Sequence, residues 1–111
     1  MDVTISEKQG VTVVAIIGEL DSKAAPIAQE KVLAVAATQP KMVLDMSQVA
    51  FMSSAGLRML LSLYRAISGR GGKVVLVGLS ADLKDTMSMT GFLDFFTCVP
   101  TLGEGIAQLT P

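Results

Sequence analysis

The 111-residue sequence contains no histidine, no tryptophan and a single cysteine, Cys98. A chain without histidine cannot form a Ser-His-Asp triad, a Cys-His dyad or a histidine-containing zinc site, and one thiol cannot form a disulfide within the chain. Charged residues make up 17% of the chain and the formal net charge is −1. This balance favours neither nucleic acid nor an anionic membrane as a partner. We therefore expect no metal, no cofactor and no direct contact with nucleic acid.

Long apolar runs are also missing. The longest stretch without a charged residue is the 12 residues of 46–57, whereas a membrane span needs about 20. Asp2, Glu7 and Lys8 stand where a signal peptide would be basic and then apolar. Half of the residues are hydrophobic, which is too many for a disordered chain. We expect one globular domain over residues 1–111 without a membrane span, cytoplasmic and monomeric.

The order of apolar segments predicts an α/β fold. Two β-branched segments, 1–6 and 11–17, flank Gln9-Gly10 and predict an antiparallel hairpin. Further strands are predicted at 42–44, 74–77 and 95–99, and helices at 24–37, 54–68, 81–90 and 102–109. Because helices separate the later strands, these strands should pair in parallel through right-handed crossovers. The prediction is a mixed sheet with parallel core strands, an N-terminal hairpin at one edge and about four helices.

Capping residues and apolar spacing give finer expectations for the helices. Asp21 or Ser22 should cap the first helix and Ser80 the third, and Gly69 should end the second in a left-handed conformation. The predicted buried face of the helix over 54–68 consists of Leu57, Leu60, Leu61, Tyr64 and Ile67.

The motifs of phosphate-binding and hydrolytic enzymes are incomplete. The segment 69–74, Gly-Arg-Gly-Gly-Lys-Val, lacks the spacing and the hydroxyl of a phosphate-binding loop, so its glycines predict a helix stop and a turn. The segment 52–56, Met-Ser-Ser-Ala-Gly, lacks the first glycine of a nucleophile elbow, and no histidine can accept the serine proton. A small phosphate- or nucleotide-handling enzyme is therefore disfavoured, and turnover by the protein alone would be needed to revive it.

Two adjacent serines, Ser53 and Ser54, stand where a predicted strand leads into the strongest predicted helix. Ligands of open α/β sheets meet the loops at the carboxyl ends of the strands. The free N–H groups and the dipole of a helix N-terminus favour negative charge there, so a phosphate on one of these serines would be tolerated. The plainer interpretation is that one serine only caps the helix.

Several motifs resemble the STAS-domain family of bacterial anti-sigma factor antagonists. They are Gly-Glu-Leu-Asp at 18–21, Leu-Asp-Met-Ser-Gln-Val at 44–49, Phe-Met-Ser-Ser-Ala-Gly-Leu-Arg-Met-Leu-Leu at 51–61, Gly-Gly-Lys at 71–73 and Met-Thr-Gly-Phe at 89–92. The resemblance implies the α/β fold predicted above and a partner switch. In that switch an anti-sigma factor serine kinase phosphorylates one serine of the antagonist. The unmodified antagonist binds the kinase and releases the sigma factor, and a metal-dependent serine phosphatase removes the phosphate.

Carried over by position, the phosphoacceptor of this family falls on Ser54, with Ser53 as the second choice. The best-known members have an aspartate at the position of Ser53, so the substitution leaves a second hydroxyl and removes a charge. We expect the partner-binding residues to be Asp21, Ser53, Ser54, Gly56, Arg58 and Met59. Glycine at position 56 would allow a close backbone approach.

The plainer roles of these residues remain open. Asp21 could serve only as a helix cap and Asp45 only as a turn aspartate. Arg58 and Arg65 could pair with carboxylates of a partner or be merely solvated. Met52, Met59 and either Met87 or Met89 could form an exposed, adaptable contact surface or simply fill the core.

A regulatory binding protein, not an enzyme, is the function that these observations favour. The alternative is a STAS-like docking subunit of a membrane transport complex, in which no serine need be phosphorylated. The intact Ser-Ser-Ala-Gly-Leu segment at 53–57 favours the phosphorylated switch.

Overall fold

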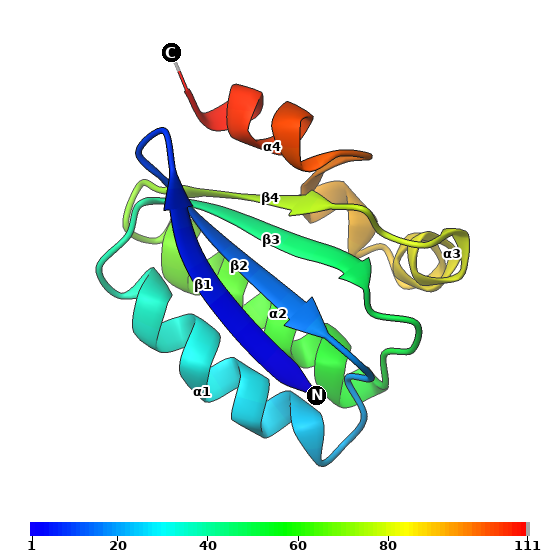
Figure 1. The fold of residues 1–111 in the computed structure, drawn as a ribbon. Coiled ribbons are helices and arrows are strands. Elements are labelled where there is room, and N and C mark those ends of the chain that lie inside the picture. The colour runs from blue at the N-terminus through cyan, green and yellow to red at the C-terminus, as the bar shows by residue number, and fades with distance from the viewer. Residues whose placement is uncertain (111) are drawn as a thin grey trace.

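The computed structural model describes residues 1–110, which form five strands and four α-helices (Figure 1). The strands are β1 (Asp2–Lys8), β2 (Val11–Ile17), β3 (Lys41–Gln48), β4 (Lys73–Val77) and β5 (Thr97–Val99). The helices are α1 (Ala24–Ala36), α2 (Ser54–Ser68), α3 (Ala81–Met89) and α4 (Leu102–Leu109), and a short 3₁₀ helix, η1 (Leu93–Phe95), precedes β5.

The strands form one mixed sheet in the order β1-β2-β3-β4-β5. β1 pairs with β2 in antiparallel fashion, and the remaining neighbours pair in parallel. The hairpin turns at Gln9 and Gly10, whose φ angles of 55° and 78° are both left-handed, as a two-residue type I′ turn requires. The predicted α/β fold, with its N-terminal hairpin and parallel core strands, is confirmed.

Helices cover both faces of the sheet (Figure 1). α1 and α2 pack against one face, and α4 packs against the other. The core under α1 and α2 includes Val14, Ile16, Ala28, Val32, Leu44, Met46, Leu60, Leu63 and Leu76. The smaller core under α4 consists of Val11, Val13, Val43, Val75, Val77, Ile106 and Leu109. Since burying one such aliphatic side chain stabilises the fold by about 1.5–3 kcal/mol, the two cores hold the sheet between its helix layers.

The helix at 102–109 forms despite two glycines because one of them serves packing. Gly105 is buried, and a Cβ atom built on it would lie 2.6 Å from Cγ2 of Val77. Helix α4 can approach β4 closely only without a side chain at this position.

Several boundaries and conformations differ from the sequence prediction. Gly69 has a right-handed φ of −63°, and the left-handed residue is Gly71, with φ 77°. The prediction for Gly69 was wrong because the chain continues in a right-handed turn beyond the helix, and the Gly72 N–H then donates to the carbonyl oxygen of Ile67. The strand predicted at 95–99 is shorter, since 93–95 form η1.

The buried face of α2 also differs in part. Leu57, Leu60 and Ile67 are buried as predicted, but Leu61 and Tyr64 are only half-buried. Met59 and Leu63 take the two inner places. α2 packs on α1 as well as on the sheet, so its buried stripe lies further toward α1 than simple spacing indicates.

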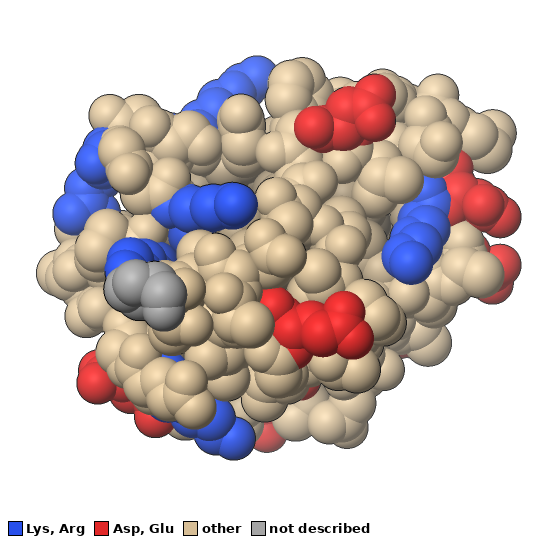
Figure 2. Space-filling model, turned by 90° about the horizontal axis from the view of Figure 1, so that it is seen from above, with Lys and Arg blue, Asp and Glu red and all other residues tan. Residues whose placement is uncertain are grey.

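The face that α4 occupies carries charges of both signs. Figure 2 shows this face from above: several Lys and Arg side chains lie on the left, another on the right lies against acidic side chains, and uncharged surface lies between them. The picture agrees with the nearly neutral net charge of the chain.

Candidate functional site

Two loops that are far apart in the sequence lie side by side at the carboxyl ends of β2 and β3. The Leu20 N–H donates to the carbonyl oxygen of Phe51 at 2.9 Å, and the Ser53 N–H donates to the carbonyl oxygen of Leu20 at 2.9 Å. Leu20 and Met52 thereby form a parallel bridge that continues the pairing of β2 and β3. The loop that carries Asp21 is thus joined to the loop that carries the two serines.

Ser53 is the capping serine. Its hydroxyl donates to the carbonyl oxygen of Leu20 at 3.0 Å and accepts from the Gly56 N–H at 3.4 Å. The residue is half-buried and has extended backbone angles, as an N-cap residue should. One hydroxyl therefore satisfies an orphan helix N–H and connects α2 to the neighbouring loop.

Ser54 is placed differently. It is the first residue of α2 and is exposed. Among residues 1–110, no hydrogen bond to another residue engages its hydroxyl. A negative group attached there would face the positive end of the helix dipole. The two serines thus have distinct roles: Ser53 holds the helix start, and Ser54 presents a free hydroxyl.

Asp21 bonds to the backbone at the start of α1, although the N-cap position itself is Lys23, whose side chain makes no cap bond. Its Oδ1 accepts from the N–H groups of Lys23 at 3.1 Å and Ala24 at 2.8 Å, at the start of α1. The carboxylate is half-buried and oriented by these bonds. Asp45 likewise serves the local backbone, because its Oδ1 accepts from the Ser47 N–H at 3.0 Å.

Gly56 allows α2 to lie close to the joined loops. A Cβ atom there would overlap Cγ of Met52 and would lie 3.2 Å from both Cβ and the carbonyl oxygen of Leu20. Gly56 is buried, so its expected backbone role is confirmed and it offers no surface to a partner.

Of the two interpretations of the methionines, core filling holds for most of them. Met59 is 1% exposed and Met52 is 6% exposed. The expectation that Met59 contacts a partner was wrong, because its position on α2 faces the core. Met87 is fully buried, and only Met89 on α3 is exposed, at 87%.

Two exposed apolar side chains, one of them in the serine loop, were missed by sequence reasoning. Phe51 is 48% exposed in the loop before α2, and Ile27 is 53% exposed in the first turns of α1. Ile27 could have been found, because it lies off the apolar stripe formed by Ala25, Ala28 and Val32. Exposed large apolar residues at such a place are typical of a surface that another protein covers.

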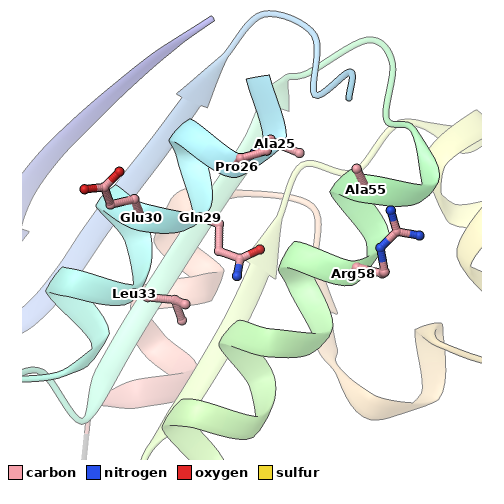
Figure 3. A pocket seen from close by; sticks show the side chains of 7 residues that line it. All are labelled: Ala25, Pro26, Gln29, Glu30, Leu33, Ala55 and Arg58. Carbon is pink, nitrogen blue, oxygen red and sulfur yellow. The ribbon is translucent and has the colours of Figure 1, made fainter. Parts of the chain in front are cut away.

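A groove of about 330 Å³ runs between α1 and the first turns of α2. Its walls are Ala25, Pro26, Gln29, Glu30, Leu33, Ala55 and Arg58. Figure 3 shows the Arg58 guanidinium turned toward the first turn of α2, close to Ala55. Arg58 is exposed, which fits both a partner contact and a solvated side chain.

The remaining chemistry of the described residues is sparse. No group of three His, Cys, Asp or Glu residues within 1–110 could hold a metal ion. Cys98 is half-buried, and this desolvation raises the pKa of its thiol, although Lys84 acts in the opposite direction. A higher thiol pKa means less of the reactive thiolate.

The sequence of residues 2–105 matches the STAS domain family. The chain belongs to this family. The anti-sigma-B factor antagonist of Bacillus subtilis (strain 168) is 27% identical to it over 108 residues, which cover 97% of this chain and 98% of that protein. The STAS-domain resemblance that the motifs carry is thereby confirmed.

Solved structures share the fold. The crystal structure of an anti-sigma factor antagonist from Mycobacterium paratuberculosis has a TM-score of 0.88 and 28% identity, covering 97% of this chain and 92% of that one. The murine anion transporter Slc26a9 contains the same fold, with a TM-score of 0.80 and 22% identity over 94% of this chain but only 18% of the transporter chain. In this STAS domain, none of the helices within residues 1–110 has the length and apolarity to cross a membrane.

Proposed function

We propose that this STAS-domain protein is an anti-sigma factor antagonist whose binding is switched by phosphorylation of Ser54. The observation that carries the proposal is the difference between the hydroxyl groups of the two serines. The Ser53 hydroxyl is engaged by Leu20 and Gly56, whereas the Ser54 hydroxyl is exposed at the first position of α2. Similarity to two anti-sigma factor antagonists supports the choice of function.

The unmodified protein binds an anti-sigma factor serine kinase and so frees the sigma factor or an equivalent target. The contact surface centres on Ser54 and includes Phe51 and Arg58, both of which are exposed. Asp21, Ser53 and Gly56 support this surface from beneath by fixing the two loops and the start of α2. A surface of this kind combines apolar anchors with a polar rim, as protein interfaces do.

Phosphorylation transfers the γ-phosphoryl group of ATP to Oγ of Ser54, and ADP and the hydroxyl proton leave. The phosphate adds about −1.5 to −2 charges at pH 7. A partner surface fitted to a neutral hydroxyl must then accommodate extra bulk and an incompletely paired charge. That costs about 3–4 kcal/mol, which is a loss of about 10²–10³ in affinity.

A metal-dependent serine phosphatase restores the unmodified form by transferring the phosphoryl group to water. The metal in this cycle belongs to the phosphatase. The antagonist itself catalyses no step and acts in the cytoplasm as a monomer by occupying or leaving its partner.

Site-mapped phosphorylation tests the proposal. The wild-type protein, Ser53→Ala and Ser54→Ala would each be incubated with ATP and a lysate from the protein's own source, and the modified residue mapped by mass spectrometry. One ATP-dependent phosphate that disappears only in Ser54→Ala is the expected result. Absence of phosphate, under conditions where a known kinase substrate is modified, would overturn the switch.

The docking role in a transport complex is the second candidate, because the same fold occurs within an anion transporter. That likeness is one of fold. The two candidates differ in a simple way: a docking subunit would be captured with a membrane transporter irrespective of the state of Ser54. The antagonist would be captured with a kinase and released by phosphorylation.

A further inference from the structure

Ser54 and Arg58 occupy the same side of α2. They are four residues apart, a spacing that brings the Cβ atoms of a helix to within about 5–6 Å of each other. Both residues are exposed, and Arg58 extends back along the helix rather than away from it. Figure 3 shows its guanidinium beside Ala55, in the turn that Ser54 begins.

The other charged groups around this turn are three carboxylates and the exposed ammonium group of Lys23 at the start of α1. Glu30 of α1 lines the groove together with Arg58. In the joined loop, Asp21 is oriented by the N–H groups of Lys23 and Ala24, and Glu19 is exposed. Each carboxylate would repel a phosphate on Ser54. Of the two cations, only Arg58 lies on the same helix as Ser54 at the spacing of four residues, so it is the side chain placed to pair with the phosphate.

We infer that Arg58 pairs in cis with the phosphate on Ser54, so that modification removes both the free hydroxyl and the free guanidinium from the surface offered to the partner. This inference rests on the proposed phosphorylation of Ser54. An arginine fork matches phosphate oxygens in a bidentate manner, and the dianion is a stronger ligand for it than the Glu30 carboxylate across the groove.

The pairing gives Arg58 two states with different functions. In the unmodified protein the guanidinium lies close to Ala55 and is available to a carboxylate of the partner. In the modified protein it is held by a phosphate on its own helix. Phosphorylation therefore opposes binding by taking away a contact as well as by adding a charge.

The second pKa of the phosphate measures the pairing directly, because a neighbouring cation favours the dianion. Phosphoserine would be installed at position 54 during synthesis, and the pKa determined by ³¹P NMR titration for the wild-type chain, Arg58→Gln and Arg65→Gln. Arg65 is the matched control: it lies on the same helix and is exposed, but it is 11 residues, or about 16 Å, further along. That distance exceeds the Debye length of about 8 Å at physiological salt.

Arg58→Gln is expected to raise the second pKa of the phosphate by about 0.5, and Arg65→Gln is expected to leave it unchanged. Equal pKa values in the two variants would overturn the inference. Thermal unfolding of the same samples verifies that both variants are folded.

The readout does not need a kinase, so the two proposals fail separately. A lysate that leaves Ser54 unmodified would overturn the proposed function but not the measured pairing. Equal pKa values would overturn the pairing but leave a mapped phosphate on Ser54 standing.

Discussion

The hydroxyl of Ser53 donates to the carbonyl oxygen of Leu20, 33 residues earlier in the chain, at a distance of 3.0 Å. This bond ties the start of α2 to the loop that precedes α1. The same hydroxyl accepts from the Gly56 N–H. Ser53 therefore has a structural role at the start of α2, whereas the hydroxyl of Ser54 makes neither of these bonds.

Replacing Ser53 with alanine should destabilise the protein. The variant loses a helix cap and leaves the Gly56 N–H without its acceptor, whereas the Leu20 carbonyl oxygen keeps the Ser53 backbone N–H as a donor. The loss costs about 1–2 kcal/mol in the free energy of unfolding. Ser54→Ala is the matched control and should change this free energy by less than about 0.5 kcal/mol. Urea unfolding followed by circular dichroism would measure both, and equal losses would show that the two serines share the capping role.

Substitutions at Ser54 should act on binding instead. Ser54→Ala removes the acceptor oxygen and should stay bound to the kinase after ATP is added. Ser54→Glu places a permanent negative charge at the helix start and should weaken binding at least tenfold, or about 1.4 kcal/mol. Calorimetric titration against the kinase identified by phosphate mapping would compare them, and equal affinities of the two variants would contradict the switch.

Gly56→Ala should destabilise the fold although alanine favours helices. The added Cβ atom meets Met52 and Leu20 in a packed region, and such overpacking costs about 1–3 kcal/mol. Gly103 in α4 provides the control, because a Cβ atom there has no neighbour within 4 Å.

Gly103→Ala should stabilise the protein by up to about 1 kcal/mol through helix propensity alone. Denaturant midpoints of the two glycine variants should therefore move in opposite directions. A stabilising Gly56→Ala would show that α2 does not need its close approach to the joined loops.

Phe51→Ser should weaken partner binding without harming the fold. Phe51 is 48% exposed beside the serines, and an apolar anchor at the centre of an interface contributes about 2 kcal/mol or more to binding. Ile5→Ser is the control, since Ile5 is similarly exposed, at 52%, but lies on edge strand β1. A loss of affinity of tenfold or more is expected for Phe51→Ser alone, and equal effects would place the partner elsewhere.

Much of this structure follows from local sequence signals. The predicted bounds of α2 and α4 agree with the structure because Ser53 and Thr101 mark their starts with side-chain caps. The parallel order of the later strands follows from the helices between them. The family motif identified the pair of serines, and the structure then distinguished the role of Ser53 from that of Ser54.

The parts that sequence reasoning missed depend on distant contacts. The Ser53 hydroxyl bonds to the carbonyl oxygen of Leu20, which lies 33 positions earlier. Local sequence signals do not show which of the two serines makes this bond. Met59 is buried because α2 is rotated toward α1 as well as toward the sheet, and helical spacing alone does not fix that rotation. The exposure of Phe51 likewise depends on how the two loops are joined, since its carbonyl oxygen, and not its ring, makes the bond to Leu20.

The bridge between Leu20 and Met52 has an evolutionary consequence. Its bonds join main-chain atoms, so mutations in the exposed side chains around it, such as Glu19, Ala50 and Phe51, leave the frame of the two loops intact. Duplicated copies of such a gene could drift toward different partners in one cell while each kept a serine in the same place. The fold thereby permits several proteins with different, non-overlapping partners to evolve from a single ancestor without a change of the backbone.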